Sequence, residues 1–225
     1  MAEVIASVLP YALGVILSPL SAIAIILLLV SDQGVRKGWV FLVVWYLTCA
    51  AVPLLLAPLV KEGAPDRPHV VAAWVHLLLG LALLASAVVG AYRLRHRDPG
   101  AAPAQAPTWM SAMDRMGLGK VVVAAVLLNL ANPVNMAVLL AATATLGRYS
   151  LGFAGNAVVA ALFALACSLA VLVPFLMAVW PGRDPGPLLQ RLRAFLVTYN
   201  SAIQMVTALV FGLVLVLNGV RVLWG

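Results

Sequence analysis

The sequence has little charge. Only 9% of its 225 residues are charged, whereas 64% are hydrophobic and the mean hydropathy is +1.09. Soluble domains are roughly half apolar and a quarter charged, so this composition excludes an ordinary soluble domain and indicates a protein that crosses a membrane several times. The apolar residues do not alternate as they would in strands, which favours membrane-spanning helices over a barrel.

Acidic residues are scarce, and none lies deep in an apolar segment. The seven fall at segment ends or in polar stretches: Glu3, Asp32, Glu62, Asp66, Asp98, Asp114 and Asp184. Transporters coupled to protons or sodium usually keep a carboxylate inside the membrane, and a metal site needs a cluster of ligands. The sequence also lacks the HExxH, GxSxG and phosphate-loop motifs. We therefore expect neither an enzyme nor a bound metal or cofactor.

There are only two cysteines, Cys49 and Cys167, and they form no CxxC motif. Each is expected midway along an apolar segment, where cysteine packs as a small apolar residue. Nothing in their spacing indicates a redox function.

Six apolar segments are long enough to cross a membrane, which takes about 20 residues. They cover residues 4–30, 38–60, 70–93, 118–146, 153–180 and 200–224. The first is preceded by Met1-Ala2-Glu3 without a basic region, so we interpret it as a helix of the protein and not as a signal peptide. The expected fold is an all-α integral membrane protein with six transmembrane helices.

The basic residues gather on one side of these segments. The first, third and fifth loops hold ten of the 14 Lys and Arg residues, against four on the other side: Arg36, Lys37, Arg93, Arg95, Arg97, Arg115, Lys120, Arg183, Arg191 and Arg193, against Lys61, Arg67, Arg148 and Arg221. The positive-inside rule predicts that these three loops are cytoplasmic and that both termini are outside. Topology explains this pattern better than nucleic-acid binding does.

The one long polar stretch divides the chain into two halves. Residues 94–117 are predicted to form a cytoplasmic linker between a three-helix repeat at 1–93 and a second at 118–225. Three spans per half insert the halves in opposite directions, as a 3+3 inverted-topology repeat. A shift of 114 residues superposes "SPLS", which begins at Ser18, on "NPVN", which begins at Asn132.

These paired motifs are predicted to break the first and fourth helices. Ser18 and Asn132 suit the N-cap of a helix, Pro19 and Pro133 suit its first position, and Ser21 and Asn135 then fall at its third. Two helix starts inside a membrane expose amide donors and positive dipole ends, which must be buried or line a cavity. We predict one substrate site for an anionic or oxygen-rich group, formed by Ser18, Ser21, Asn129, Asn132 and Asn135. The simpler alternative is a pair of proline kinks with locally satisfied polar groups.

Two further features remain open at this point. His76 is the one imidazole predicted inside a span, where it is a possible proton relay or a hydrogen-bonded interfacial residue. Residues 185–200 space their leucines on one face between arginines, which predicts an interfacial amphipathic helix leading into the last span.

At these motifs the chain resembles the peptidoglycolipid addressing protein (GAP, or Sap) family of the lysine-exporter (LysE) superfamily. The similarity is carried by "LGVILSPLSAIAIILLLVSDQGVRKGWVFLVVW", "LLNLANPVNMAVLLAAT" and "FGLVLVLNGV". It implies a six-span inverted-repeat transporter of a bacterial plasma membrane that exports glycolipids or related envelope components. Relatives that carry electrons have cysteines beside the comparable Ser-Pro, where this chain has Leu20 and Ser21, and the membrane acids of cation exporters are absent.

Three functions are consistent with the sequence. The leading hypothesis is export of an amphiphilic envelope lipid by alternating access at the paired breaks. The second is export of amino acids or another small solute. The third is a membrane scaffold that does not transport but assists a larger export machine. The expected partners are membrane lipids and the substrate, with a homo-oligomer or export machinery also possible and no nucleic acid.

Overall fold

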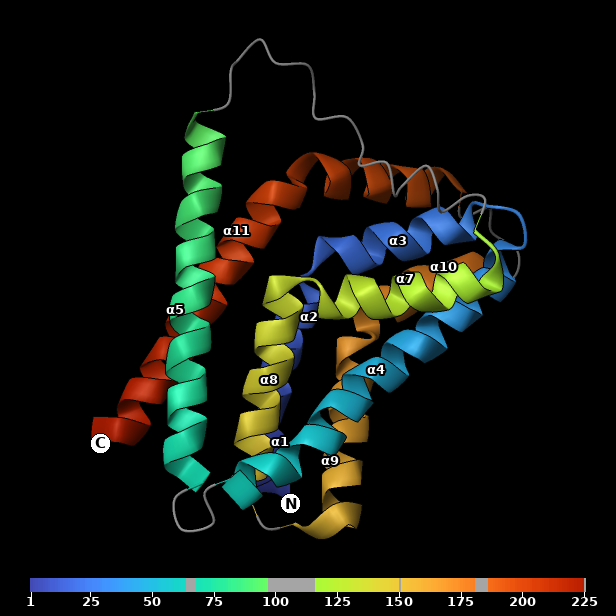
Figure 1. Cartoon of the computed structure of the whole chain (residues 1–225). Helices are drawn as coiled ribbons and strands as arrows, with labels where there is room; N and C mark the ends of the chain where they lie inside the picture. Colours follow the sequence, from blue (N-terminus) through green and yellow to red (C-terminus); the bar gives the residue numbers. More distant parts are fainter. Residues whose placement is uncertain (64–67, 97–115, 150, 181–185, 225) are drawn as a thin grey trace.

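The computed structural model describes residues 1–63, 68–96, 116–149, 151–180 and 186–224, and within these ranges the chain is helical (Figure 1). The elements are α1 (Ala2–Val8), the 3-10 turn η1 (Leu9–Tyr11), α2 (Ala12–Ile16), α3 (Pro19–Leu29), α4 (Gly34–Gly63), α5 (Pro68–Arg95), α7 (Leu118–Leu130), α8 (Pro133–Gly147), α9 (Gly152–Cys167), α10 (Leu169–Val179) and α11 (Gly186–Trp224).

Three of these helices, α4, α5 and α11, are long and apolar enough to cross a membrane alone. Three further candidate spans are bent pairs: α1–α2 with α3, bent by 59°, α7 with α8, bent by 72°, and α9 with α10, bent by 59°. If each bent pair is one span, the described chain has up to six, which agrees with the predicted number.

The first and fourth spans break where the sequence predicted. Ser18 and Asn132 are the N-cap residues of α3 and α8, and each is followed by a proline at the first helical position. Their backbones are extended and nearly identical, with φ/ψ of −71°/111° at Ser18 and −77°/117° at Asn132. A residue before proline is driven out of the helical region by contact with the proline ring, which explains both breaks.

The fifth span is also broken, whereas the sequence predicted one uninterrupted helix over residues 153–180. The Ser168 hydroxyl donates to the Ala164 carbonyl at 2.7 Å, a contact that often bends helices. Pro174, inside α10, lacks the N–H that would bond to the Ala170 carbonyl. Both features weaken the backbone hydrogen-bond ladder around the bend.

The ends of the elements divide between two sides of the molecule. In Figure 1 the N-terminus, the C-terminus, the end of α4 and the junction of α8 with α9 lie in the lower part. The junction of α3 with α4, the end of α5 and the starts of α7 and α11 lie in the upper part. This is the alternation that six crossings produce. That the upper side is cytoplasmic stays a prediction from the charge distribution.

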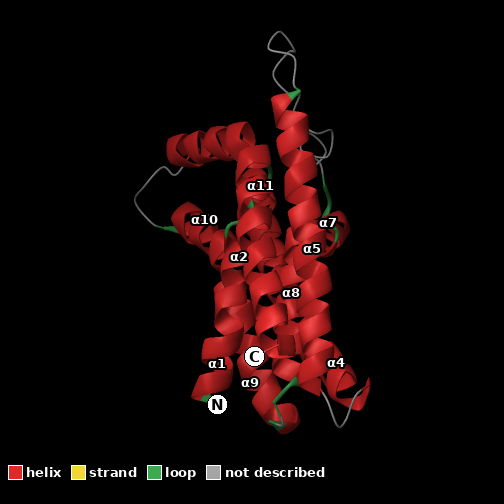
Figure 2. Cartoon of the chain, turned by 90° about the vertical axis from the view of Figure 1, so that its left-hand side faces the viewer, coloured by secondary structure: helices red, strands yellow, loops and turns green. Residues whose placement is uncertain are grey.

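Helices α3 and α8 form the interior. All of Ile23–Leu28 in α3 and most of α8 are buried, and Figure 2 shows α8 surrounded by other helices. The long helices instead expose large apolar side chains, such as Leu55, Leu78 and Leu217. In a membrane protein such side chains face lipid, so the burial pattern distinguishes inner from outer spans.

The predicted amphipathic segment is not a separate helix. It is continuous with the last span in α11, which has 39 residues. Figure 1 shows the first part of α11 lying across the top of the molecule before the helix turns downward. Pro185 itself and residues 97–115 of the predicted linker lie outside the described residues, and α5 extends to Arg95, two residues into the predicted linker.

Candidate functional site

The two predicted helix breaks meet in space. The Asn132 side-chain amide donates to the Ser18 hydroxyl at 2.9 Å, and the two residues are separated by the same 114 positions that relate the two motifs. The N-terminal ends of α3 and α8 are therefore brought to one point by a direct contact between their capping residues.

The two caps differ in chemistry. The Asn132 side-chain oxygen accepts from the backbone N–H groups of Val134, at 3.0 Å, and Asn135, at 3.5 Å. Ser18 takes the predicted N-cap position of α3, but its hydroxyl makes no capping bond to the α3 amides and instead accepts from Asn132. Ser21 donates to the Ser18 carbonyl at 3.0 Å, so it stabilises the turn and not the free amides.

Two predicted site residues have buried side-chain polar atoms without hydrogen-bond partners in the described chain. Asn129 and Asn135 are completely buried, and neither side-chain polar atom of Asn135 has a partner among the described residues. Asn129 donates to the Cys49 sulfur at 3.2 Å, but its oxygen has no partner in the part of the chain that the structure describes. A buried polar group without a partner costs about 1–3 kcal/mol. Buried polar groups without partners, gathered beside two helix starts, are typical of a functional site.

Three residues that were not predicted from the sequence complete this region. Cys49 contacts Asn129, and the Cys167 thiol interacts with Cys49, which brings the third break next to the first two. Trp45 lies one helical turn before Cys49, and its indole N–H is buried without a partner in the described chain. No sequence signal pairs these residues, because each is an ordinary apolar-segment residue.

His76 lies in a second buried polar cluster. Its Nδ1 faces the Ala72 carbonyl and must donate to it, so in the neutral ring Nε2 accepts. Tyr11 and Thr145 hydroxyls lie 2.9 and 3.1 Å from Nε2, and Asn218 donates to the Tyr11 hydroxyl at 3.3 Å. The cluster joins η1, α5, α8 and α11.

The two polar regions lie at different depths. Thr145 is 13 residues beyond Asn132 in α8, which places the His76 cluster about 20 Å along the helix axis from the breaks. Thr145 lies in the last turn of α8, and Figure 1 shows that end of α8 on the side of the molecule that holds both termini. His76 is therefore not beside the predicted substrate residues.

The fold and this site define a class: a helical, multi-pass membrane protein whose interrupted helices meet at a buried polar point. Within that class, the chain belongs to the Sap, sulfolipid-1-addressing protein family, whose model matches residues 8–221. The predicted membership of the Sap family is thereby confirmed. Comparisons with curated proteins and with solved structures gave no match.

Proposed function

We propose that the protein exports an amphiphilic lipid of the cell envelope and that the two helix starts bind its polar group. The observation that carries this proposal is the contact between Ser18 and Asn132, which joins the two breaks. The family name, sulfolipid-1-addressing protein, supports a lipid as the cargo.

The chemistry of the breaks supports an anionic or oxygen-rich ligand group. A helix start presents backbone N–H donors and the positive end of its dipole, each dipole contributing about 0.3–1 kcal/mol toward an anion. Within the described chain, the Asn135 side chain adds an NH2 donor and an oxygen acceptor without partners, and the Asn129 side-chain oxygen adds a second unused acceptor. Ser18 and Asn132 would exchange their mutual hydrogen bond for bonds to the ligand.

Alternating access completes the proposal. The two halves would form an inverted repeat, and one would rock against the other about the paired breaks. The His76 cluster would close the side that holds the termini, because it ties three spans to η1 through buried hydrogen bonds. Within this cluster, His76 would relay protons through the Tyr11 hydroxyl, and this role is part of the same proposal.

The test replaces the capping pair. A deletion strain complemented with Ser18→Ala plus Asn132→Ala should lose export, measured by lipid profiling of the outer envelope, while the protein remains folded in detergent. Thr143→Ala is the matched control, because its buried hydroxyl in α8 bonds only to its own helix, at the Leu139 carbonyl. Normal lipid export by the double variant would contradict the proposed site.

The same profiling distinguishes the other two functions. A small-solute exporter would leave envelope lipids unchanged in the deletion strain and would alter extracellular metabolites. A scaffold would lose lipid export on deletion but tolerate the double variant. Each result would replace the proposal by a named alternative.

A further inference from the structure

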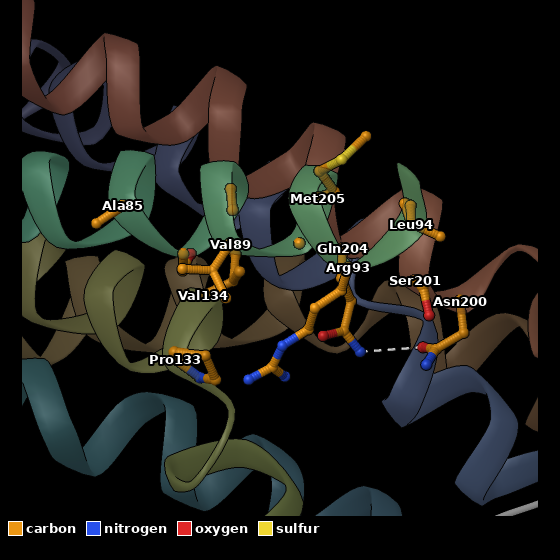
Figure 3. A pocket seen from close by; sticks show the side chains of 13 residues that line it. Ala85, Val89, Arg93, Leu94, Pro133, Val134, Asn200, Ser201, Gln204 and Met205 are labelled. Carbon is orange, nitrogen blue, oxygen red and sulfur yellow. Dashed lines mark hydrogen bonds between the residues drawn. The ribbon is translucent and has the colours of Figure 1, made fainter. Parts of the chain in front are cut away.

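A pocket separate from the capping pair lies between α5, α11 and the start of α8. Its volume is about 720 Å³, within the range of ligand-binding pockets. Pro133 and Val134 form one wall, but Ser18, Ser21, Asn129, Asn132 and Asn135 do not line it. Figure 3 shows the Arg93 side chain extending into the pocket toward Pro133.

The pocket is polar at one end and apolar at the other. Arg93, Asn200 and Ser201 lie at the end where α5 finishes, whereas Ala85 and Ala208 lie eight residues deeper in their respective helices. Eight helical residues span about 12 Å. Because α5 ends and α11 turns downward on the same side, both helices place their polar residues at the membrane surface and their small apolar residues toward its middle (Figure 1).

The charge of the polar end is positive. Arg93 is the one charged residue among the described residues that line the pocket, and its side chain has no ion pair or hydrogen bond within the described chain. The Gln204 amide donates to Asn200 at 3.0 Å, which fixes the two amides side by side (Figure 3). Pro133 is the first residue of the 15-residue helix α8, whose N-terminal dipole adds positive potential on the opposite wall.

The pocket opens sideways. Ala85, Ser86 and Val89 of α5 line it and are exposed. Exposed residues in the middle of a membrane span face lipid, so a molecule dissolved in the leaflet can enter without crossing water. A soluble metabolite would find this opening covered by acyl chains.

We propose that this pocket takes up an anionic amphiphile from the leaflet on the side where α5 ends, with Arg93 contacting the phosphate or sulfate of its headgroup. The apolar end holds the part of an acyl chain nearest the headgroup, and the Asn200–Gln204 pair binds headgroup oxygens. The inference rests on the proposed function and deepens it, because it names the charge of the cargo and a pocket that binds the cargo beside the start of α8.

The test measures lipid binding by native mass spectrometry of the full-length protein, supplied with equal amounts of phosphatidylglycerol and phosphatidylcholine. The unmodified protein should retain phosphatidylglycerol preferentially, and Arg93→Gln should weaken that retention about tenfold, as expected for loss of one charged hydrogen-bonding partner. Arg95→Gln is the matched control, because it removes the same charge from the same helix end but does not line the pocket. Arg93→Lys should restore part of the preference.

A second variant tests the apolar end. A Cβ at Gly90 would lie 3.6 Å from the Met205 side chain, an ordinary contact, so Gly90→Leu should fold and fill the pocket. It should reduce retention of both lipids at this site. Equal losses in Arg93→Gln and Arg95→Gln, or unchanged retention in Gly90→Leu, would overturn the proposal. Binding of inorganic phosphate as tight as that of phosphatidylglycerol would overturn the assignment to a lipid.

Binding and export are separate readouts. If the variant with Ser18→Ala plus Asn132→Ala exports normally and the anionic preference still depends on Arg93, the proposed substrate site fails and this inference stands. If that double variant loses export but Arg93→Gln binds lipid normally, the proposed function stands and this inference fails.

Discussion

Ser18 and Asn132 hold equivalent positions in their helices but make different hydrogen bonds. The Asn132 side chain accepts from two backbone N–H groups through its oxygen and donates to Ser18 through its nitrogen. Three hydrogen bonds therefore depend on this one side chain. Ser18 takes part in the contact between the breaks and leaves the amides of α3 without a side-chain cap. The asymmetry follows from chemistry, because an amide can donate and accept at once through two atoms.

Asn132→Ala should therefore destabilise the protein more than Ser18→Ala. It loses the shared hydrogen bond and also the cap, whose removal costs about 0.5–2 kcal/mol. Thermal unfolding in detergent should show the lower midpoint for Asn132→Ala. In a double-mutant cycle the pair should couple by about 0.5–1.5 kcal/mol. Additive losses would contradict the hydrogen bond between the two breaks.

At the scale of elements, the most extensive packing in the described chain is between α5 and α11, and it is also close. A Cβ added at Gly80 would come within 2.7 Å of the Val216 backbone nitrogen, and one at Gly212 within 3.0 Å of the Gly80 carbonyl oxygen. The helices can approach this closely only because both residues lack side chains at the crossing. Ten residues along α5, Gly90 faces Met205 with room for a methyl group, so the packing loosens toward the pocket.

Gly80→Val should separate α5 from α11 and lower both the yield and the unfolding midpoint, since backbone atoms cannot move aside as side chains can. Gly90→Ala, the control in the same helix, should match the unmodified protein. Size-exclusion profiles and thermal unfolding in detergent measure both variants. A Gly80→Val protein as stable as the Gly90→Ala protein would show that the crossing is not as close as described.

At the scale of the whole molecule, both termini lie on the side opposite the end of α5 (Figure 2). The excess of Lys and Arg on the α5 side predicts that it faces the cytoplasm. The pocket at Arg93 would then open to the inner leaflet, and the His76 cluster would lie toward the outside. Transport from the inner leaflet outward, as expected for an exporter, therefore requires this orientation.

Cysteine labelling of intact cells tests the orientation. In a background with Cys49→Ala and Cys167→Ala, Glu3→Cys and Arg221→Cys should react with a membrane-impermeant maleimide, and Ala104→Cys should react only after permeabilisation. Labelling of Ala104→Cys in intact cells, with protection of the other two, would reverse the orientation and the proposed direction of transport.

The sequence by itself determined the helical membrane class, the number of candidate spans and the positions of two breaks. Apolar length and proline sterics act locally, so they can be read from short segments. For example, α7 and α8 are separate helices because the Pro133 ring excludes Asn132 from the helical backbone conformation. This effect does not depend on the position of the rest of the chain. The family followed from the same local motifs.

The tertiary structure alone decided which polar atoms meet. The bond from Asn132 to Ser18, the approach of Cys167 to Cys49, and the His76 cluster all join residues far apart in the chain. Their partners depend on helix rotation and crossing, which many weak packing contacts set together. The pocket beside Arg93 escaped the sequence for the same reason. The break at Ser168 has local causes, the Ser168 bond to Ala164 and Pro174, but neither feature by itself forces a helix to break.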